Sequence, residues 1–326
     1  MPRAPDFWAA GSQSALPALL APLAWLYGAA QSHRRRNARP VDIGIPVISV
    51  GNLVAGGAGK TPTALALALL LRKLGRNPAF VSRGYGGSQT GPLQVDASKH
   101  TASDVGDEPL LLAATAPTWI GRDRPAAALL AKQAGHDLII ADDAHQTHAL
   151  ARRLNLLVVD AGYGFGNGRL LPAGPLRESI EDGLARSHAV IRIGQDTVAP
   201  KRFGTLPVFQ ARLRPDPEDV AAFKGQRMLA FAGIGRPEKF FQSVIDTGAD
   251  VVEMQAFADH AAYTPDRIMR LVEEAHRLNA MPVTTAKDLM RFPLEARAMV
   301  RCLRVDLDFD DEAGLLAFLR ERLQHV

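Results

Sequence analysis

A glycine-rich loop between a strand pattern and a helix pattern constrains the fold of this chain more than any other feature. The stretch 47–63 reads VISVGNLVAGGAGKTPT, with β-branched residues before the loop and Ala/Leu-rich sequence after it. This arrangement is typical of a phosphate-binding loop (P-loop). Glycines let backbone N–H groups approach an anion closely, and the new helix adds its free N–H groups and positive dipole end. The stretch therefore predicts a nucleotide-binding α/β domain.

Each residue at the end of this loop has an expected contact with a nucleotide. Lys60 is expected to reach the β- and γ-phosphates, and the Thr61 hydroxyl is expected to bind Mg²⁺. The usual pattern G-x-x-x-x-G-K-S/T requires a glycine where this chain has Val54. A glycine-rich turn with a chance Gly-Lys-Thr is the alternative, which the flanking strand and helix disfavour. The residues expected to cradle the triphosphate are Gly56, Gly57, Ala58, Gly59, Lys60, Thr61 and Pro62.

Composition narrows the class of protein further. With 326 residues, 22% of them charged and 47% hydrophobic, the chain is neither disordered nor a polytopic membrane protein, and it has room for two domains. A net charge of +4 suits anionic partners such as nucleotides, phospholipid surfaces or phosphorylated substrates. The single cysteine, Cys302, excludes internal disulfides and a cysteine-based metal cluster within one chain, in keeping with a reducing compartment.

Residues 1–40 differ in character from the rest of the chain. The uncharged run Ala15–Ala30 is interrupted by two prolines and is shorter than the ~20 apolar residues of a spanning helix. Its basic cluster, at 33–39, follows the apolar run, whereas a signal peptide carries its charge first. We expect a membrane-associated segment that lies in the bilayer surface with its arginines on the cytoplasmic side. The alternative is a helix that packs on the soluble core or mediates dimerisation.

Two α/β patterns follow this segment. Strand and helix signals alternate through 41–217, which predicts a P-loop NTPase-like domain with a parallel sheet and ligands at the carboxyl ends of its strands. The proline-rich stretch 198–218 is expected to be a connector. From about residue 227 the pattern restarts, so 218–326 is expected to form a second, smaller α/β domain.

Two aspartates end the apolar strand pattern at 138–141. In a P-loop fold such a strand lies beside the P-loop strand, and its terminal carboxylate holds Mg²⁺ directly or through water. Asp142 and Asp143 are therefore candidate metal ligands. The alternative is that Asp143 caps a following helix.

Several other polar residues stand where loops meet expected helices or strands. Asp107, in Gly-Asp-Glu-Pro, is either a helix cap or a carboxylate that accepts the proton of an attacking hydroxyl. Arg177, beside Glu178, either neutralises charge on a transferred phosphoryl group or forms a weak surface ion pair. His260, beside Asp259, is by itself more often incidental than catalytic. The candidates for binding an anionic substrate, which could equally be solvated loop residues, are Arg83, Gly84, Tyr85, Arg122 and Arg124.

Nine motifs occur in an order that matches one known family. They are GNLVAGGAGKTP, SRGYGG, GDEP, GRDR, the Asp142–Asp143 pair with Gln146, LLPAGPLRE, AFAGIGRPEKFF, FADH and TTAKD, and they extend from Gly51 to Asp288. In these residues the chain resembles tetraacyldisaccharide 4'-kinase, the lipid A 4'-kinase of Gram-negative bacteria. The ordered set is far more specific than the P-loop alone.

The resemblance implies transfer of the ATP γ-phosphate to the 4'-hydroxyl of a tetraacyl glucosamine disaccharide 1-phosphate, with Mg²⁺. It implies a peripheral or monotopic protein at the cytoplasmic face of the inner membrane, and neither a nucleic acid nor an obligate protein partner is inferred. Asp107 would be the catalytic base, His260 its orienting partner and Arg177 the group that stabilises the transition state. Lys60 and Thr61 would hold the phosphates and Mg²⁺, the two aspartates would anchor the metal, and Glu178 is placed with them. Domain closure would bring Asp107 and His260 together.

One motif departs from the family pattern. The family usually reads Asp-Asp-Gly-Phe-Gln-His after its apolar strand, whereas this chain reads Asp-Asp-Ala-His-Gln-Thr at 142–147. Ala144 replaces a permissive glycine, so the turn is expected to differ. Thr147 replaces a histidine, so no role for that histidine is carried over, and His145 or His148 is a possible substitute.

Two other functions fit part of the sequence. A membrane-surface ATPase switch also combines a Lys-Thr P-loop with an amphipathic membrane helix, but it transfers no phosphate to a sugar. It has no need of the second α/β domain with its FADH and TTAKD motifs. A soluble small-molecule ligase or kinase, whose N-terminus packs on the core, is the third reading.

Overall fold

The computed structural model describes residues 5–194 and 200–324, and its larger sheet carries the P-loop. Within these residues the sheet has nine strands, in the order β13-β8-β7-β6-β1-β5-β2-β4-β3, with the P-loop strand β1 in the middle. Neighbours from β8 to β4 run parallel, and the two outer pairs run antiparallel, as the register of each pair shows. The strands are β1 (Val47–Gly51), β2 (Pro78–Ser82), β3 (Leu93–Gln94), β4 (Thr118–Ile120), β5 (Leu138–Asp142), β6 (Leu154–Asp160), β7 (Ala189–Ile193), β8 (Val208–Pro215) and β13 (Val305–Phe309).

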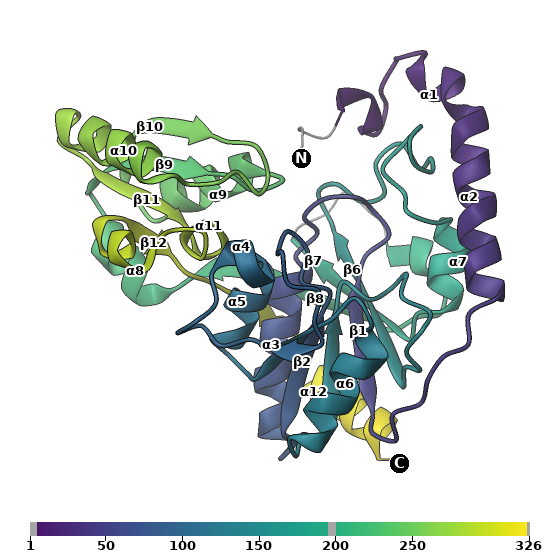
Figure 1. The fold of residues 1–326 in the computed structure, drawn as a ribbon. Helices are drawn as coiled ribbons and strands as arrows, with labels where there is room; N and C mark the ends of the chain where they lie inside the picture. The colour runs from purple at the N-terminus through teal and green to yellow at the C-terminus, as the bar shows by residue number, and fades with distance from the viewer. Residues whose placement is uncertain (1–4, 195–199, 325–326) are drawn as a thin grey trace.

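Helices cover both faces of this sheet (Figure 1). Successive residues of a strand point to opposite faces, so Ile48 of β1 packs with α3 and α12, whereas Val47 packs with α6. Because both faces are buried, the central strands are apolar runs without a polar side. The helices of this unit are α3 (Lys60–Lys73), α4 (Ala102–Val105), α5 (Asp107–Ala113), α6 (Arg124–Gln133), α7 (Ile180–Ala185), η2 (Pro200–Phe203) and α12 (Glu312–Leu323).

A four-stranded parallel sheet forms the core of the second, smaller unit, in the order β10-β9-β11-β12. The P-loop sheet and this second sheet confirm the fold class expected from the sequence. The strands are β9 (Arg227–Ala232), β10 (Asp250–Ala256), β11 (Met281–Thr285) and β12 (Arg301–Leu303). The helices are α8 (Pro217–Phe223), α9 (Pro237–Asp246), α10 (Pro265–Arg277), α11 (Ala286–Leu289) and η3 (Leu294–Met299).

The last strand and helix return to the larger sheet, which differs from the expectation that 218–326 lie together. β13 pairs antiparallel with β8, and Leu315, Leu319 and Leu323 of α12 join the core beneath α3. The pairing covers the open edge of β8, which would otherwise present unpaired backbone groups. The stretch 198–218 is also more than a connector, since 208–215 form β8; residues 198 and 199 lie outside the described part of the chain.

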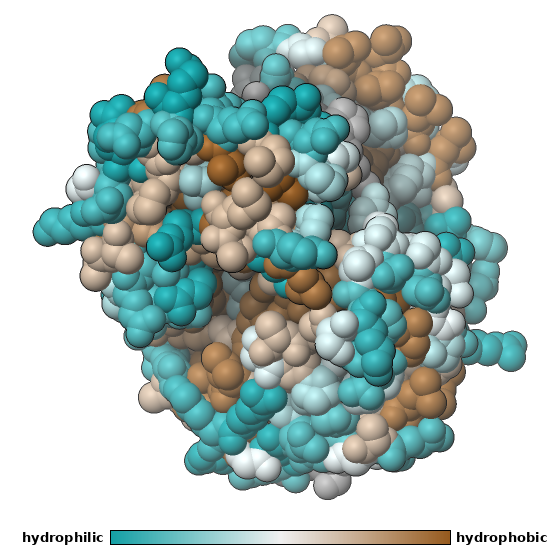
Figure 2. Space-filling model, turned by 60° about the vertical axis from the view of Figure 1, so that its left-hand side comes forward, coloured by the Kyte–Doolittle hydropathy of each residue, from teal (hydrophilic) through white to brown (hydrophobic). Residues whose placement is uncertain are grey.

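The N-terminal segment forms η1 (Asp6–Trp8), α1 (Leu16–Leu19) and α2 (Ala21–Arg36), which runs along one side of the molecule (Figure 1). Leu19 and Trp25 are 75% and 71% exposed. Figure 2 shows brown, apolar side chains at the top right of the molecule, at the height of these helices. Across residues 5–194 and 200–324, none of the helices has the length and hydropathy of a bilayer span. A membrane role for this segment stays a prediction.

Candidate active site

The P-loop joins β1 to α3 and has the glycine geometry that a tight anion cradle requires. Gly59 has a φ of 86°, a left-handed conformation that favours glycine, and a Cβ at this position would also push against the end of the Ile193 side chain, 2.4 Å away. α3 begins at Lys60, whose side chain is largely buried. The Lys60 Nζ atom lies 3.7 Å from Asp143 Oδ1. The P-loop lysine therefore meets the second aspartate of the pair at the end of β5.

Val54, which stands where the usual P-loop pattern has glycine, has a packing role. It is buried and forms an antiparallel bridge with Leu176. Next to it, Ala55 N–H donates to the Pro175 carbonyl (2.8 Å) and Arg177 N–H donates to the Leu53 carbonyl (2.7 Å). The loop that carries Arg177 is thus fastened along the first half of the P-loop.

The two aspartates after β5 have different surroundings. β5 lies beside β1 in parallel register, with Val50 opposite Asp142. Asp142 is buried and its Oδ2 atom has no hydrogen-bond partner. Burial, together with the nearby carboxylates of Glu108 and Asp143, raises the pKa of Asp142 to about 7. A buried carboxylate oxygen of this kind is suited to a cation.

Asp143 forms ion pairs with two cations, Lys60 and Arg177. Arg177 Nη1 donates to both of its carboxylate oxygens (2.9 and 3.0 Å), and Lys60 lies on the same side. Burial raises the pKa of Asp143, but the charges of Lys60 and Arg177 outweigh it, so the pKa lies below the ordinary value. Lys60, Asp143 and Arg177, far apart in the sequence, are therefore brought to one point.

Glu178 does not lie free for a metal ion. Its Oε1 atom accepts a hydrogen bond from Gln146 Nε2 (2.8 Å), and its Oε2 atom pairs with Arg186. Within residues 5–194 and 200–324, no three or more His, Cys, Asp or Glu side chains are arranged to hold a metal. Mg²⁺ is commonly bound through only one or two carboxylates and the phosphates of a substrate. Among the expected ligands, Asp142 has the surroundings that suit a cation best, and the metal roles of Thr61, Asp142, Asp143 and Glu178 stay predictions.

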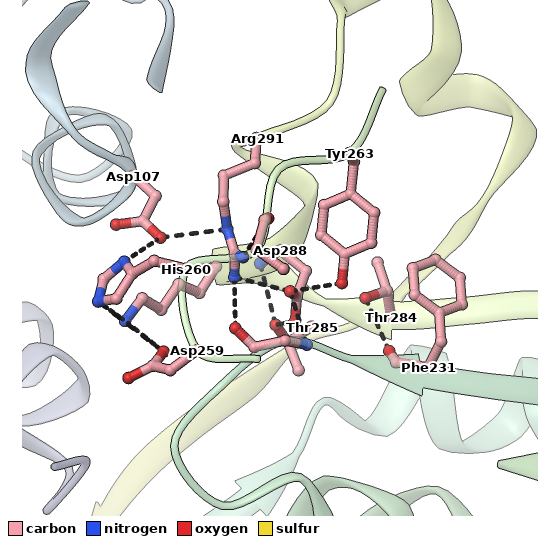
Figure 3. Close-up of polar contacts among 12 residues, drawn as sticks. Asp107, Phe231, Asp259, His260, Tyr263, Thr284, Thr285, Asp288 and Arg291 are labelled. Atoms are coloured by element: carbon pink, nitrogen blue, oxygen red, sulfur yellow. Dashed lines mark hydrogen bonds and ion pairs between the residues drawn. The ribbon is translucent and has the colours of Figure 1, made fainter. Parts of the chain in front are cut away.

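Asp107 and His260 meet across the two α/β units, as Figure 3 shows. His260 Nδ1 lies 3.1 Å from Asp107 Oδ2, although the residues are 153 positions apart. Asp107 starts α5 directly after Gly106, where a Cβ would lie 2.4 Å from the Tyr85 carbonyl. Burial raises the pKa of Asp107, but the hydrogen bond from His260 and the charges of Lys287 and Arg291 outweigh it, so the pKa is lowered. The carboxylate is ionised and oriented.

Arg291 and Lys287 each contact one member of the Asp107–His260 pair. The sequence did not predict the contact of Arg291. Arg291 Nε lies 3.2 Å from Asp107 Oδ2, and Lys287 Nζ lies 3.4 Å from His260 Nε2. Arg291 is itself held by Asp288 (2.7 Å), a buried carboxylate that also accepts from the Tyr263 hydroxyl (2.8 Å). The TTAKD motif indicated Lys287 and Asp288, whereas nothing in the local sequence distinguishes Arg291.

The expected substrate-binding residues fall into two groups. Arg83, Tyr85 and Arg122 are exposed, and the Tyr85 ring lies edge-on to His260 with centroids 5.5 Å apart. Gly84 is buried and has a positive φ, which lets the loop turn behind Tyr85. Arg124 differs from the expectation, because it is buried and donates to the carbonyls of Asp142 (3.1 Å) and Asp143 (3.0 Å). Arg124 supports the aspartate turn from within and is not presented to an outside ligand.

The departures from the family motif at 144 and 147 are absorbed locally. The left-handed backbone conformation falls on Asp143 (φ 45°), so the turn does not require glycine at Ala144. Thr147 accepts a hydrogen bond from Arg124. His145 lies within hydrogen-bond distance of the Gly183 carbonyl, and its burial lowers its pKa to about 4. His145 is a neutral, structural histidine here.

Comparisons with known proteins agree over nearly the whole chain. Residues 16–324 match the family model described as Tetraacyldisaccharide-1-P 4'-kinase. The tetraacyldisaccharide 4'-kinase of Rhodospirillum centenum is 50% identical over 314 residues, which cover 95% of this chain and 93% of that protein. The Rhodospirillum rubrum protein of the same name is 48% identical over 323 residues, covering 97% of each chain.

One solved structure is similar to this chain over nearly its whole length. The crystal structure of the "apo" form of LpxK from Aquifex aeolicus in complex with ATP is similar to this chain with a TM-score of 0.75 and 26% sequence identity. The match covers 94% of this chain and 99% of that one. Both α/β units are therefore within the matched region.

Proposed function

This chain belongs to the tetraacyldisaccharide-1-P 4'-kinase family, and on that premise we propose its reaction. It is an ATP-dependent kinase that transfers the γ-phosphate to the 4'-hydroxyl of a tetraacyl glucosamine disaccharide 1-phosphate, a step of lipid A biosynthesis. Two contacts carry this function. Asp107 and His260 meet across the two units, and Lys60 of the P-loop and Arg177 both pair with Asp143. Such a site has a base for the acceptor and cations for the donor.

Asp107 is the group suited to receive the proton of the attacking hydroxyl. Its lowered pKa keeps it ionised at neutral pH, and burial excludes most water from it. His260 donates from Nδ1, and Arg291 lies 3.2 Å from the same carboxylate oxygen. Both residues belong to the smaller unit, whereas Asp107 belongs to the larger one. These two contacts fix the direction of the carboxylate, so that the base stays in place while the acceptor binds.

Lys60 and Arg177 are suited to bind the charge of the transferred phosphoryl group. Both cations pair with Asp143, which directly follows β5, the strand beside β1. Asp143 therefore holds them at the carboxyl end of the sheet, next to the P-loop. Positive charge placed where negative charge develops in the transition state lowers the barrier to phosphoryl transfer. The roles proposed for these two residues and for Asp107 rest on this geometry and on the family.

Mg²⁺ is proposed as the accompanying metal, held by Asp142 and Thr61. The unpartnered Oδ2 atom of Asp142 supports this choice, because a buried carboxylate oxygen without a donor is costly unless a cation pairs with it. When bound, the ion would neutralise charge on the phosphate oxygens.

The N-terminal segment supports a location at the cytoplasmic face of the inner membrane, peripheral or monotopic. Its exposed apolar side chains, Leu19, Leu23, Trp25 and Leu26, lie in α1 and α2, and the basic cluster at 33–39 begins in the last turn of α2. An acylated acceptor resides in a bilayer, so an enzyme that lies on that surface meets it directly.

The test is transfer of radiolabel from γ-labelled ATP to the acylated disaccharide 1-phosphate in detergent micelles. The expected result is a labelled bisphosphorylated lipid whose formation requires Mg²⁺ and is abolished by Lys60→Ala. A surface ATPase switch instead predicts phosphate release at the same rate with and without the acceptor. That outcome would contradict the kinase function.

A further inference from the structure

A second set of contacts joins the two units, and it falls on the P-loop itself. The loop at 233–236 joins β9 to α9 and lies against the glycines of the P-loop. A Cβ on Gly235 would lie 3.4 Å from the Gly57 nitrogen, and Arg236 Nη2 donates a hydrogen bond to the Gly57 carbonyl. The same loop also contacts the other site, because the Gly233 carbonyl accepts hydrogen bonds from His260 N–H (3.2 Å) and Arg291 Nη2 (2.8 Å).

Arg236 is held in place by residues of the larger unit. Its Nη2 atom lies 2.8 Å from Asp160 Oδ2, at the carboxyl end of β6, the strand next to β1. Asp160 is buried and also pairs with Lys239 of α9. The Arg236 guanidinium lies over the Tyr163 ring, with Cζ 5.1 Å from its centroid. An arginine with a buried carboxylate, an aromatic face and a carbonyl as partners has little rotational freedom.

Asp160 is in turn fixed by its own backbone surroundings. Its Oδ1 atom accepts hydrogen bonds from the N–H groups of Gly162 (2.9 Å) and Tyr163 (3.2 Å). Burial raises the pKa of Asp160, but Arg236 and Lys239 outweigh it, so the pKa lies below its ordinary value. Asp160 is a fixed negative charge beside the P-loop strand.

The hydrogen bond to the Gly57 carbonyl has a consequence for the peptide that follows. In a trans peptide the C=O and the next N–H point in opposite directions, so Arg236 directs the Ala58 N–H away from itself. An added Cβ on Gly56 or Gly57 would meet no atom within 4 Å, so side-chain packing does not hold the loop on this side, and the Arg236 hydrogen bond is a contact that orients it. Ala58 N–H is one of the groups expected to face the triphosphate.

We propose that Arg236, anchored by Asp160, is a positioning residue for ATP that orients the Gly57–Ala58 peptide of the P-loop. Because Arg236 and His260 belong to the same small unit, the contact also ties nucleotide binding to the placement of the Asp107–His260 pair. This inference deepens the proposed kinase function and rests on it for the identity of the nucleotide. It assigns Arg236 no contact with the reacting atoms.

The experiment compares the full chain with Arg236→Ala, Arg236→Lys and Asp160→Asn. The dissociation constant of ATP is measured by calorimetry, and kcat and both KM values by the transfer assay. Loss of a charge-assisted hydrogen bond should weaken ATP binding by about tenfold or more in Arg236→Ala. The KM for the lipid acceptor should change much less. Lysine keeps the charge but not the planar guanidinium that lies over Tyr163 while its Nη2 atom reaches Gly57 and Asp160, so Arg236→Lys should recover only part of the ATP affinity.

A control variant and a double variant test whether the loss of ATP binding is specific to the Arg236–Asp160 contact. Arg227→Ala, an exposed arginine of the same unit that pairs with Asp250, should bind ATP like the unchanged chain. Combining Arg236→Ala with Asp160→Asn should weaken ATP binding no more than the stronger single change, because the two residues act as one unit. If Arg236→Ala does not fold, Arg236→Lys decides the question.

ATP affinity that is unchanged in folded Arg236→Ala, or in Arg236→Lys where that variant decides, would overturn the inference. So would equal losses for ATP and acceptor, which would indicate a general structural role. The proposed function fails separately, if the unchanged chain binds ATP yet transfers no phosphate to the lipid. In that case a specific loss of ATP binding in Arg236→Ala would still support the positioning role.

Discussion

Asp107 illustrates how the chemistry of one residue depends on neighbours that the local sequence does not specify. By itself, an aspartate at the start of a helix is most simply a cap. In the structure its carboxylate is nearly covered, and His260 and Arg291 hold one of its oxygens. Gly106 brings the chain close against the Tyr85 carbonyl, which places Asp107 at the junction of the two units.

Asp107→Asn should lower kcat by about 100-fold or more, because the amide cannot accept the acceptor's proton. The dissociation constant of ATP should stay unchanged, since the Asp107 carboxylate contacts the Glu108 N–H, His260 and Arg291, none of which is in the P-loop. The transfer assay and calorimetry measure the two quantities. Asp266→Asn, an exposed carboxylate on α10 of the smaller unit, is the control and should retain full activity. A fully active Asp107→Asn enzyme would rule out the base assignment.

At the scale of elements, the N-terminal segment has two different sides. On one side, Trp8 Nε1 donates to the Pro172 carbonyl (3.0 Å), and Arg35 pairs with Asp182 of α7 (2.9 Å). The segment therefore packs on the loop that leads to Arg177. On the other side, Leu19 and Trp25 are exposed. Removing the whole segment would disturb both sides, so point substitutions on the exposed side give the cleaner test of membrane binding.

Leu19→Glu combined with Trp25→Glu should reduce binding to anionic phospholipid vesicles by about tenfold or more, because two large apolar side chains no longer enter the bilayer surface. Sedimentation with vesicles measures the bound fraction, and high salt should weaken the remainder. Leu69→Glu, a half-exposed leucine on α3, is the matched control. If the double variant binds vesicles as well as the unchanged chain, the anchor lies elsewhere.

At the scale of the whole molecule, the chain crosses between the two units twice. It leaves the larger sheet after β8, builds the four-stranded sheet and returns through β13 and α12. Leu319 is fully buried in the core that also holds α3, the helix that begins at the P-loop lysine. The end of the chain therefore stabilises the unit that binds the nucleotide.

Leu319→Ala should lower the free energy of unfolding of the larger unit by about 2–5 kcal/mol, through lost burial and the cavity that remains. Urea denaturation followed by circular dichroism, with and without ATP, measures the change, and ATP should shift the same transition upward. Arg320→Ala, exposed on the same helix, should have little effect. A change confined to a transition that ATP does not shift would place α12 with the smaller unit.

The sequence alone determined the features that are encoded in short stretches. Glycine spacing, apolar strands and helix starts are local properties, so the P-loop at 47–63 and the aspartates at the end of β5 were predicted at their positions. The motif order indicated the family, and through it the pairing of Asp107 with His260. The resemblance was needed for that pairing, because no local rule joins residues 153 positions apart.

Only the tertiary structure decided which charged residues face a ligand and which support the fold. Arg124 and Arg122 look alike in the sequence, yet one is buried beneath the aspartate turn and the other is exposed. Arg291 and Asp160 have no distinctive local pattern, and Arg236 was marked only as part of the AFAGIGRPEKFF motif, with no role attached. All three gain their roles from strands and loops that meet across the two units. The physical reason is that burial and Coulomb partners depend on distance in space, which a separation along the chain does not specify.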